Sequence, residues 1–571
     1  MIFFFKQKYY SFISFLKKID QVIRKTIGVE SSFYKKYRFI IQYYHFEFIG
    51  YLFFGLLPFF VFNFFHPFTV EHYEKFLNLF GYLPYGIVCA VGLVPMTIHF
   101  YNNGVKWWKI ILALVVAIFI LGVCVCIFDH DWNGKPSFLH FYNELFVVDT
   151  FNYPFLFLTF TIFPLVVLAS VDTQRGSSFF YYSMLALLFF LLLLTFTLAG
   201  FFSFYIVFEL LGFPMFILIG LYGPREQRIA AAYKFFVYTF IGSAFILPVL
   251  VYFYFYLGST HFLYLQGYRF TDYEQSLFFV LCSFPFLVKI PVVPVHLWLP
   301  EAHVEASTPI SMLLAALLLK TGGYAFLRFL LPVFPFGVYF WSSLLSVLGL
   351  CSIFFSSVYA LIQVDLKKMI AYSSVAHMSL VFLGLINQEL TSLQGAVYLM
   401  VTHGFTSAGL FAGIGIIYDR YHTRTIRALG GIASLMPIFS LLFFYFILGN
   451  ISFPFTGGFT GEFYLLLGLT KVSLYLSLMA GSTVFLSICY SVWLFNRVFY
   501  GQIEEEVKVH QDLTGLEFAL CYFLGLGVLA TFFKGGDFAC YTQYSYGSII
   551  DVVSGEQYQI NYDRWLYHKY L

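Results

Sequence analysis

The sequence predicts an all-α polytopic membrane protein with about 14–15 transmembrane helices. Of its 571 residues, 60% are hydrophobic and only 11% are charged, and the mean hydropathy is +0.81. A soluble domain carries about 25% charged residues. Apolar runs of about 18 residues or more, the length that crosses a bilayer, recur along almost the whole chain. The sequence lacks the short alternating apolar and polar segments of a membrane β-barrel.

The apolar runs place the helices in order along the chain. Residues 1–47 are basic and aromatic, which predicts helices lying on the membrane surface ahead of the first span. A transit peptide is the alternative, and the many aromatic residues disfavour it. The spans lie near 48–65, 83–100, 108–128, 152–170, 179–199, 200–222, 232–255, 276–298, 308–330, 338–362, 368–386, 394–417, 435–465, 470–498 and 515–533.

The basic loops give the orientation of these spans. If residues 1–47 lie on the inside, the other inside loops all carry Lys or Arg, as the positive-inside rule requires. The outside loop at 129–149 is rich in Asp and His instead. The predicted inside loops are 103–108, 172–175, 224–228, 365–368 and 419–427.

Two of the longest spans contain helix-breaking residues. The stretch 291–300 contains Pro291, Pro294 and Pro300, and the stretch NISFPFTGGFTGE at 450–462 contains one proline and three glycines. Broken helices at matching positions of two halves are typical of inverted repeats that hold ion sites near the membrane midplane. We therefore expect two repeats, although the halves show no clear sequence identity.

Ionisable residues inside the spans are the candidate site. A charged residue at the centre of a membrane helix costs about 2.5–3.5 kcal/mol on insertion scales, and such residues usually face a bundle interior or a wet cavity. Acids, lysines and histidines spread over successive helices have the chemistry of a proton relay. The candidates are Glu209, Lys234, Lys289, Lys320, His377, His403 and Glu462.

Each candidate also has a structural alternative. Lys234 and Lys289 could lie near helix ends and reach the headgroups, an alternative that fits Lys320 badly because apolar residues surround it. His377 and His403 could be core histidines bonded to Ser or Thr, and Glu209 could cap a neighbouring helix.

The sequence lacks the motifs that several other chemistries would need. The sequence has no Walker loop, no nucleophile triad and no strand–GxGxxG–helix dinucleotide site. His377 and His403 are single on their helices, which does not suit a haem. Of the eight cysteines, only Cys124 and Cys126 lie close together, so we interpret all eight as core residues rather than metal ligands. The net charge of +3 gives no reason to expect a nucleic acid partner.

Long motifs around these residues carry a family resemblance. The stretches VKIPVVPVHLWLPEAHVEA, LLLKTGGYAFLRF, DLKKMIAYSSVAHMS, QGAVYLMVTHGFTSAGLF and LGNISFPFTGGFTGEF resemble the subunit 4 family of respiratory complex I, the proton-pumping NADH:ubiquinone oxidoreductase. The resemblance covers roughly residues 83–533. These antiporter-like subunits are similar to subunits of multisubunit Na⁺/H⁺ antiporters.

The resemblance implies a fold and a role for each candidate. The family has fourteen helices and two inverted five-helix repeats, each with a broken helix. By their motifs, Glu209 matches the glutamate of the fifth helix, Lys289 the lysine of the broken seventh helix and Lys320 the central lysine of the eighth. The remaining matches are His377 and His403 as relay histidines, Glu462 as the terminal glutamate, and Lys234 with a less defined role.

The ends of the chain depart from the family pattern. We divide the chain into a basic amphipathic extension at 1–47, an additional transmembrane helix and linker at 48–82, an antiporter-like core at 83–533 and a C-terminal tail at 534–571. The additions leave the core assignment intact, and we expect them to dock accessory subunits.

The implied function is proton translocation without redox chemistry on this chain. FMN, iron–sulfur clusters and ubiquinone would be bound by other subunits, and the partners would be the sister subunits 2 and 5, accessory subunits and lipids such as cardiolipin. The implied location is the mitochondrial inner membrane. The 79 phenylalanines and 45 tyrosines suggest AT-rich codons and thus an organellar gene.

The sequence suggests one order for the relay. Glu209 and Lys289 pair in one state, their separation drives a proton from Lys289 toward Lys320 through water and His377, and His403 and Glu462 form the far end. Two other functions remain open: a subunit of a cation/proton antiporter, in which the same charges would serve, and a membrane scaffold in which the charges only fix helix packing.

Overall fold

The computed structural model of the chain describes residues 141–142, 146–149, 151–171, 179–502, 512–536 and 538. Apart from residues 179–183, these belong to one compact unit, Gly104–Ser177 and Met184–Leu571. The predictions for 1–47, 48–82, the spans near 83–100 and 108–128, and nearly all of the tail at 534–571 concern residues outside the described ones.

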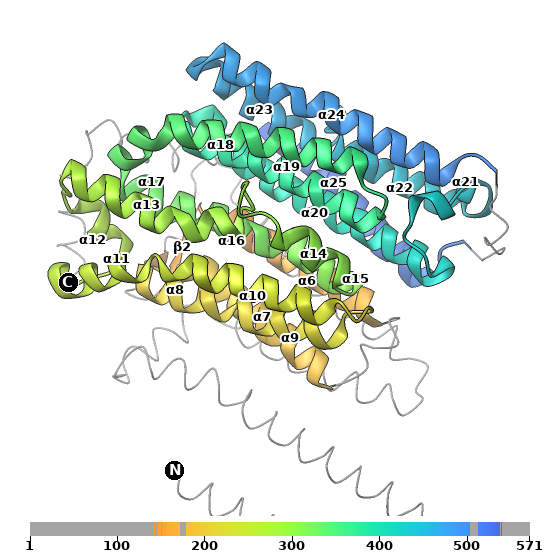
Figure 1. Ribbon diagram of the computed structural model, residues 1–571, viewed down its shortest axis with the longest axis horizontal. Helices are drawn as coiled ribbons and strands as arrows, with labels where there is room; N and C mark the ends of the chain where they lie inside the picture. Colours follow the sequence, from red (N-terminus) through yellow and green to blue (C-terminus); the bar gives the residue numbers. More distant parts are fainter. Residues whose placement is uncertain are drawn as a thin grey trace, which may run out of the picture. The chain divides into compact units, whose positions relative to one another are not determined.

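The described part of the chain consists almost entirely of helices (Figure 1). Among the described residues, ten helices are long and apolar enough to cross a membrane. A pair of two-residue strands, β1 (Phe141–Tyr142) and β2 (Val147–Val148), forms an antiparallel ladder just before the first of these helices. The prediction of an all-α polytopic membrane protein is confirmed.

The early helices coincide with the predicted apolar runs to within a few residues. The predicted span near 200–222 is a single stretch that is interrupted only by a turn at Leu211. The elements of this part are α6 (Tyr153–Val171), α7 (Phe179–Thr197), α8 (Phe201–Leu210), α9 (Gly212–Tyr222), α10 (Arg228–Ala244), α11 (Leu247–Tyr252), η1 (Phe253–Leu257) and α12 (Phe262–Gly267).

The first predicted break is present. Helix α13 (Asp272–Lys289) ends just ahead of Pro291, and the chain is not helical again until α14 (Trp298–Glu305). Inside a membrane, the backbone groups freed by such a break need protein partners. The Val293 amide donates to the Ser352 hydroxyl at 3.1 Å, and the Trp298 indole donates to the Val288 carbonyl at 2.9 Å. The break is therefore fixed by its neighbours.

The span after the break, Thr308–Val333, is the most irregular of the spanning helices described. Two π-helical turns, η2 (Leu314–Leu318) and η3 (Phe326–Leu330), flank α16 (Leu319–Ala325), with α15 (Thr308–Leu313) and α17 (Leu331–Val333) at the ends. π-turns occur often at functional sites because they rotate a side chain out of the regular helical register.

Three long helices follow, of which the last two lie at the centre of the unit. They are α18 (Pro335–Ile362), α19 (Leu366–Ile386) and α20 (Leu390–Tyr421), and two short turns come next, η4 (Ile426–Ala428) and α21 (Ile432–Leu435). The hydrophobic windows of α19, α20 and the irregular span are fully buried, whereas those of α10–η1 and α24 are 39% buried. The outer apolar faces are available to lipid or to other chains.

The second predicted break divides the run at 435–465. Helix α22 (Pro437–Asn450) ends at the start of the break, and α23 (Gly457–Val472) begins at its glycines. The chain ends its described part with α24 (Leu474–Phe499) and α25 (Gly515–Phe533). Both breaks thus lie where the sequence predicts them, while the two-repeat symmetry stays a prediction.

Glycine permits the close approach of α20 and α23. A Cβ atom on Gly395 of α20 would collide with the backbone nitrogen of Leu465 on α23. On the other side of the contact, a Cβ on Gly461 would lie 3.0 Å from the Cα of Leu399. This contact brings the residue after Gly461, Glu462, against the centre of the bundle.

Candidate functional site

Lys320 lies at the centre of the candidate site. It is on α16, between the two π-turns, and none of its surface is exposed. Its Nζ donates to the carbonyl of Ala315 at 2.6 Å and lies 2.9 Å from Nδ1 of His403 on α20. Among the described residues, no carboxylate lies within ion-pair distance of this amine. Its complete burial disfavours the headgroup alternative for Lys320.

A second pair continues from the first. Nδ1 of His377 on α19 lies 3.1 Å from Oε1 of Glu462 on α23. The rings of His377 and His403 are 5.6 Å apart between centroids. All four side chains are buried, with 7% or less of their surface exposed. The four side chains thus form one row across four helices, in the order Lys320, His403, His377 and Glu462.

The order of this row differs from the order that the sequence suggests. The sequence-based cycle puts His377 between Lys289 and Lys320, with His403 farther along. In the structure His403 contacts Lys320, and His377 lies beyond it, next to Glu462. The difference arises from packing, because α20 packs against the π-turn η2 beside Lys320 while α19 and α20 both approach α23.

A small cavity adjoins the two histidines. Its volume is about 10 Å³, and it is lined by His377, His403, Thr402, Asn450 and residues of the second break, Ser452 and Gly458 among them. A space of this size holds about one water molecule when polar groups line it. The broken helix thereby supplies polar groups to the row. Asn450 is not among the residues that the sequence predicts for the site, although a polar residue at the start of the break is a recognisable signal.

Lys289 and Glu209 lie near each other on the first-break side. Lys289 is the last residue of α13, is 3% exposed, and has its Nζ 5.1 Å from the ring centroid of Phe208 and 5.5 Å from that of Phe235. Glu209 on α8 lies close enough to Lys289 for the two charges to interact electrostatically. Both residues are described, and they make no direct ion pair, so the paired state that the sequence suggests is not the one present.

Lys234 lies apart from the row. Its Nζ is 2.6 Å from Oε2 of Glu301, and the two side chains are 52% and 41% exposed. The structure therefore favours the interfacial alternative for Lys234.

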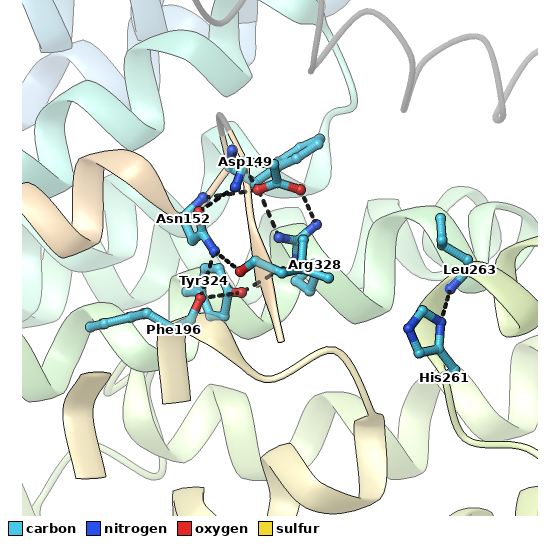
Figure 2. A network of polar contacts seen from close by, with 9 residues as sticks. Asp149, Asn152, Phe196, His261, Leu263, Tyr324 and Arg328 are labelled. Atoms are coloured by element: carbon cyan, nitrogen blue, oxygen red, sulfur yellow. Dashed lines mark hydrogen bonds and ion pairs between the residues drawn. The ribbon is translucent and has the colours of Figure 1, made fainter. Parts of the chain in front are cut away.

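A buried network, which the sequence analysis missed, fixes the other end of the irregular span (Figure 2). Both terminal nitrogens of Arg328 donate to the Asp149 carboxylate at 2.7 Å, and Nε donates to the Tyr324 hydroxyl at 3.2 Å. Asn152 donates to the carbonyls of Val147 and Phe196, and the Tyr324 hydroxyl donates to the latter as well. The only signal in the sequence was a charged residue within the apolar stretch YAFLRFL.

The network shares a helix face with the site. Lys320 and Tyr324 are four residues apart on α16 and therefore lie on one side of it. Arg328 on η3 reaches this side through its bond to the Tyr324 hydroxyl. Arg328 and Asp149 together anchor the segment before α6 to that span. Among the described residues, no three His, Cys, Asp or Glu side chains meet in a way that could hold a metal ion.

The fold and the row of buried ionisable groups define an antiporter-like membrane subunit, and sequence comparisons support this class. Residues 199–487 match the family described as NADH:quinone oxidoreductase/Mrp antiporter, TM. Residues 85–223 match NADH-ubiquinone oxidoreductase chain 4, amino terminus.

Individual relatives narrow the class. The chain is 38% identical to NADH-ubiquinone oxidoreductase chain 4 of Acanthamoeba castellanii over 439 residues, which cover 75% of this chain and 86% of the relative. With the Arabidopsis thaliana chain 4 the identity is 39%, over 78% of this chain and 92% of the relative. A chain of respiratory complex I from Thermus thermophilus superposes with a TM-score of 0.72 at 25% identity, covering 82% of this chain and 99% of that one. The chain belongs to the NADH-ubiquinone oxidoreductase chain 4 family.

Proposed function

We propose that this chain is the proton-translocating subunit 4 in the membrane arm of respiratory complex I, and that it couples NADH:ubiquinone oxidoreduction in other subunits to proton movement. The row Lys320–His403–His377–Glu462 is the observation that carries the proposal. Proton transfer through a membrane protein requires buried side chains that can each bind and release a proton, and this row supplies them across four helices. Helix packing alone does not require such side chains.

The residues take distinct roles in this proposal. Lys289 holds a proton under the influence of Glu209 and passes it to Lys320 when the two charges move apart. Lys320 passes the proton to the nearby ring of His403, which hands it through His377 to Glu462. Lys234 stays outside this row, because its ion pair with Glu301 lies at the surface.

The energies are compatible with this scheme. Moving one charge against 100 mV costs about 2.3 kcal/mol. A change in proton affinity of two pKa units corresponds to about 2.7 kcal/mol. Breaking or making one close charge interaction in a buried setting is of this size, so a local movement suffices for each transfer.

The assignment implies partners, cofactors and a location. The redox groups, FMN, iron–sulfur clusters and ubiquinone, belong to other subunits. The antiporter-like sister subunits 2 and 5 are the neighbours that we expect on the exposed apolar faces, together with accessory subunits at the chain termini and lipids such as cardiolipin. We assign the protein to the mitochondrial inner membrane and its gene to the organelle. The division into an extension at 1–47, a helix and linker at 48–82, a core at 83–533 and a tail at 534–571 is part of the proposal.

Native gel electrophoresis tests the assignment. Membranes solubilised in mild detergent are separated, stained for NADH oxidation, and the active band is analysed by mass spectrometry. We expect this chain in a very large NADH-oxidising band. Its presence only in a smaller assembly without that activity would contradict the proposal.

The second candidate function is a subunit of a multisubunit Na⁺/H⁺ antiporter. The observation in its favour is the matching family description, which covers the Mrp antiporter as well as the oxidoreductase. Proton movement driven by a Na⁺ gradient and independent of NADH would favour this candidate. Retention of all transport after neutralising both Lys289 and Lys320 would instead favour a scaffold.

A further inference from the structure

Asn450, the last residue of α22, contacts the surroundings of the row on one side and the helix α24 on the other. It is 6% exposed and lines the cavity beside His377 and His403. Its amide nitrogen donates to the hydroxyl of Ser491 on α24 at 3.1 Å. The residue therefore joins the surroundings of the two histidines to a helix that carries none of the row.

The ring of His377 has one nitrogen without a protein partner. Nδ1 lies 3.1 Å from Glu462, while Nε2 is buried and has no hydrogen-bond partner among the described residues. Buried polar atoms are almost always bonded, either to protein or to an ordered water. Because His377 lines a cavity of about 10 Å³, which has room for about one water molecule, a water is the partner that fits.

The two histidine rings need an intermediary to exchange a proton. Their centroids are 5.6 Å apart, and their planes are tilted by 50°. Each ring uses its Nδ1 for a different partner, which is Lys320 for His403 and Glu462 for His377. Since both rings line the same water-sized cavity, one water there can connect the remaining nitrogens.

Asn450 is placed to orient this water. The hydroxyls of Thr402 and Thr406, which also line the cavity, donate to backbone carbonyls of their own helix at 3.2 Å. The bond from the Asn450 amide nitrogen to Ser491 fixes the plane of the amide, and the carbonyl oxygen of the same group is an acceptor. A carbonyl that accepts one proton of the water leaves the other proton for a histidine nitrogen.

A second cavity shares Asn450 with the first. It also has a volume of about 10 Å³, and its polar lining consists of Asn450, Ser373, Tyr490 and Ser491. Ser373 belongs to α19, the helix of His377, while Tyr490 and Ser491 belong to α24. The bond between Asn450 and Ser491 thus lies beside a polar space of the size of one water. This space gives the amide room to turn when Ser491 moves.

We propose that Asn450 is a positioning residue for a water that carries protons between His403 and His377, and that Ser491 of α24 holds Asn450 in the required orientation. This inference rests on the proposed function, because it concerns one transfer step of the same row. It adds that the step depends on α24, a helix whose hydrophobic window is 39% buried. Lipid or a neighbouring chain against α24 can therefore influence the transfer through one hydrogen bond.

The transfer conserves protons. Protonated His403 gives a proton to the oxygen of the water, and the water gives one of its own protons to Nε2 of His377. The imidazolium of His377 then releases the proton on Nδ1 to the carboxylate of Glu462. The water is regenerated, and Asn450 accepts a hydrogen bond without gaining or losing a proton.

The alternative is a purely structural role, in which the bond between Asn450 and Ser491 only joins α22 to α24. Loss of that bond would then lower the amount of assembled complex, and the complex that remains would pump normally. A positioning role predicts instead that the complex assembles and that its proton-to-electron ratio falls. The ratio therefore separates the two roles.

The test uses the assembled complex in sealed inner-membrane vesicles and measures the number of protons translocated per electron during NADH oxidation. Asn450→Leu keeps a similar shape and removes the amide, so we expect its ratio to fall to that of Lys320→Met, which serves as the reference. Ser491→Ala removes the partner of the amide and should also lower the ratio. Ser491→Thr retains the hydroxyl and should keep the wild-type ratio.

Matched controls repeat these substitutions elsewhere on α24. Ser487 lies one turn before Ser491, is buried, and donates to the Val484 carbonyl at 2.8 Å, and it lines neither of the two cavities. Asn496 is exposed on the same helix. Ser487→Ala and Asn496→Leu should both keep the wild-type ratio.

Each outcome decides one of the two proposals. A wild-type ratio in Asn450→Leu or in Ser491→Ala, with a lowered ratio in Lys320→Met, overturns this inference and leaves the proposed function standing. A wild-type ratio in Lys320→Met itself overturns the proposed function. If Asn450→Leu prevents assembly, the two Ser491 variants decide: a loss in Ser491→Ala that is absent in Ser491→Thr supports the inference, and equal ratios overturn it.

Discussion

Lys320 illustrates how a membrane protein can hold a fully buried amine. Its partners are a carbonyl oxygen and a nitrogen of an imidazole ring. A carboxylate partner would bind the ammonium form strongly and oppose release of the proton. Among the described residues, no carboxylate lies within ion-pair distance of this amine, so no fixed negative charge holds its proton.

Replacing Lys320 with Met tests this role directly. Methionine fills a similar volume and has no titratable group, so we expect normal assembly, normal NADH oxidation and a lowered proton-to-electron ratio. The measurement is proton uptake by sealed vesicles against the rate of NADH oxidation. Lys471→Met is the control, because that lysine forms a surface pair with Glu389. Full pumping stoichiometry in Lys320→Met would refute the assignment.

The same substitution at Lys234 should have little effect. Its pair with Glu301 is largely exposed, and exposed ion pairs contribute about 0–1 kcal/mol. We expect Lys234→Met to assemble and to pump with the wild-type ratio. A ratio as low as that of Lys320→Met would restore Lys234 to the relay.

Arg328 and Asp149 make a different kind of buried pair. Removing one partner of a buried salt bridge leaves the other charge unpaired, which costs about 3–5 kcal/mol. Arg328→Met should therefore lower the temperature at which the complex loses activity, or reduce the amount that assembles. The double variant Arg328→Met/Asp149→Leu should recover part of the loss because no charge is left alone. Equal stability of Arg328→Met and wild type would contradict a structural role for the pair.

At the scale of helices, the sequence predicts those features that depend on the chemistry of neighbouring residues in the chain. Long apolar runs predict the spans, and Pro291 and the glycines at 457–461 predict where two helices break, because these residues disrupt helices in any context. The sequence also predicts that the four residues of the row are buried, but it misses the buried pair of Arg328 and Asp149 and includes Lys234, whose side chain is 52% exposed. It does not predict that His403 rather than His377 reaches Lys320, or that Arg328 meets Asp149, because these pairs join residues 83 and 179 positions apart. Such contacts depend on how helices pack, which no local pattern encodes.

The approach of α20 to α23 gives a prediction about helix packing. A methyl group on Gly395 would collide with the backbone of Leu465, which cannot move without shifting α23. We expect Gly395→Ala to separate the two helices, to weaken the contact of His377 with Glu462, and to lower both the amount of complex and its proton-to-electron ratio. Gly481→Ala on α24 is the control, because a Cβ there meets no atom within 4 Å. A wild-type amount of complex and a wild-type proton-to-electron ratio in Gly395→Ala would show that α20 and α23 can separate without loss of function.

For the molecule as a whole, the division between buried and exposed helices separates two tasks. The three spans whose hydrophobic windows are fully buried contribute Lys320, His377 and His403. The spans with largely exposed windows, such as α10–η1 and α24, present apolar surface outward. Three residues of the row thus lie on spans that are kept from lipid. The fourth, Glu462, lies on the inner side of α23, whose other side exposes Phe463.

A serial arrangement has a consequence for combined substitutions. If Lys320 and Glu462 act in one path, blocking the path once is sufficient. The double variant Lys320→Met/Glu462→Gln should therefore lose no more of the proton-to-electron ratio than the more affected single variant. Losses that add up would mean that the two residues serve separate paths.

The cavity beside His377 and His403 also limits what can occupy this part of the protein. A volume of about 10 Å³ accommodates about one water molecule. A metal cation with its hydration shell is several times larger than this space. In this conformation such an ion would enter only after losing its bound waters, whereas a proton moves by exchanging one O–H or N–H bond for the next.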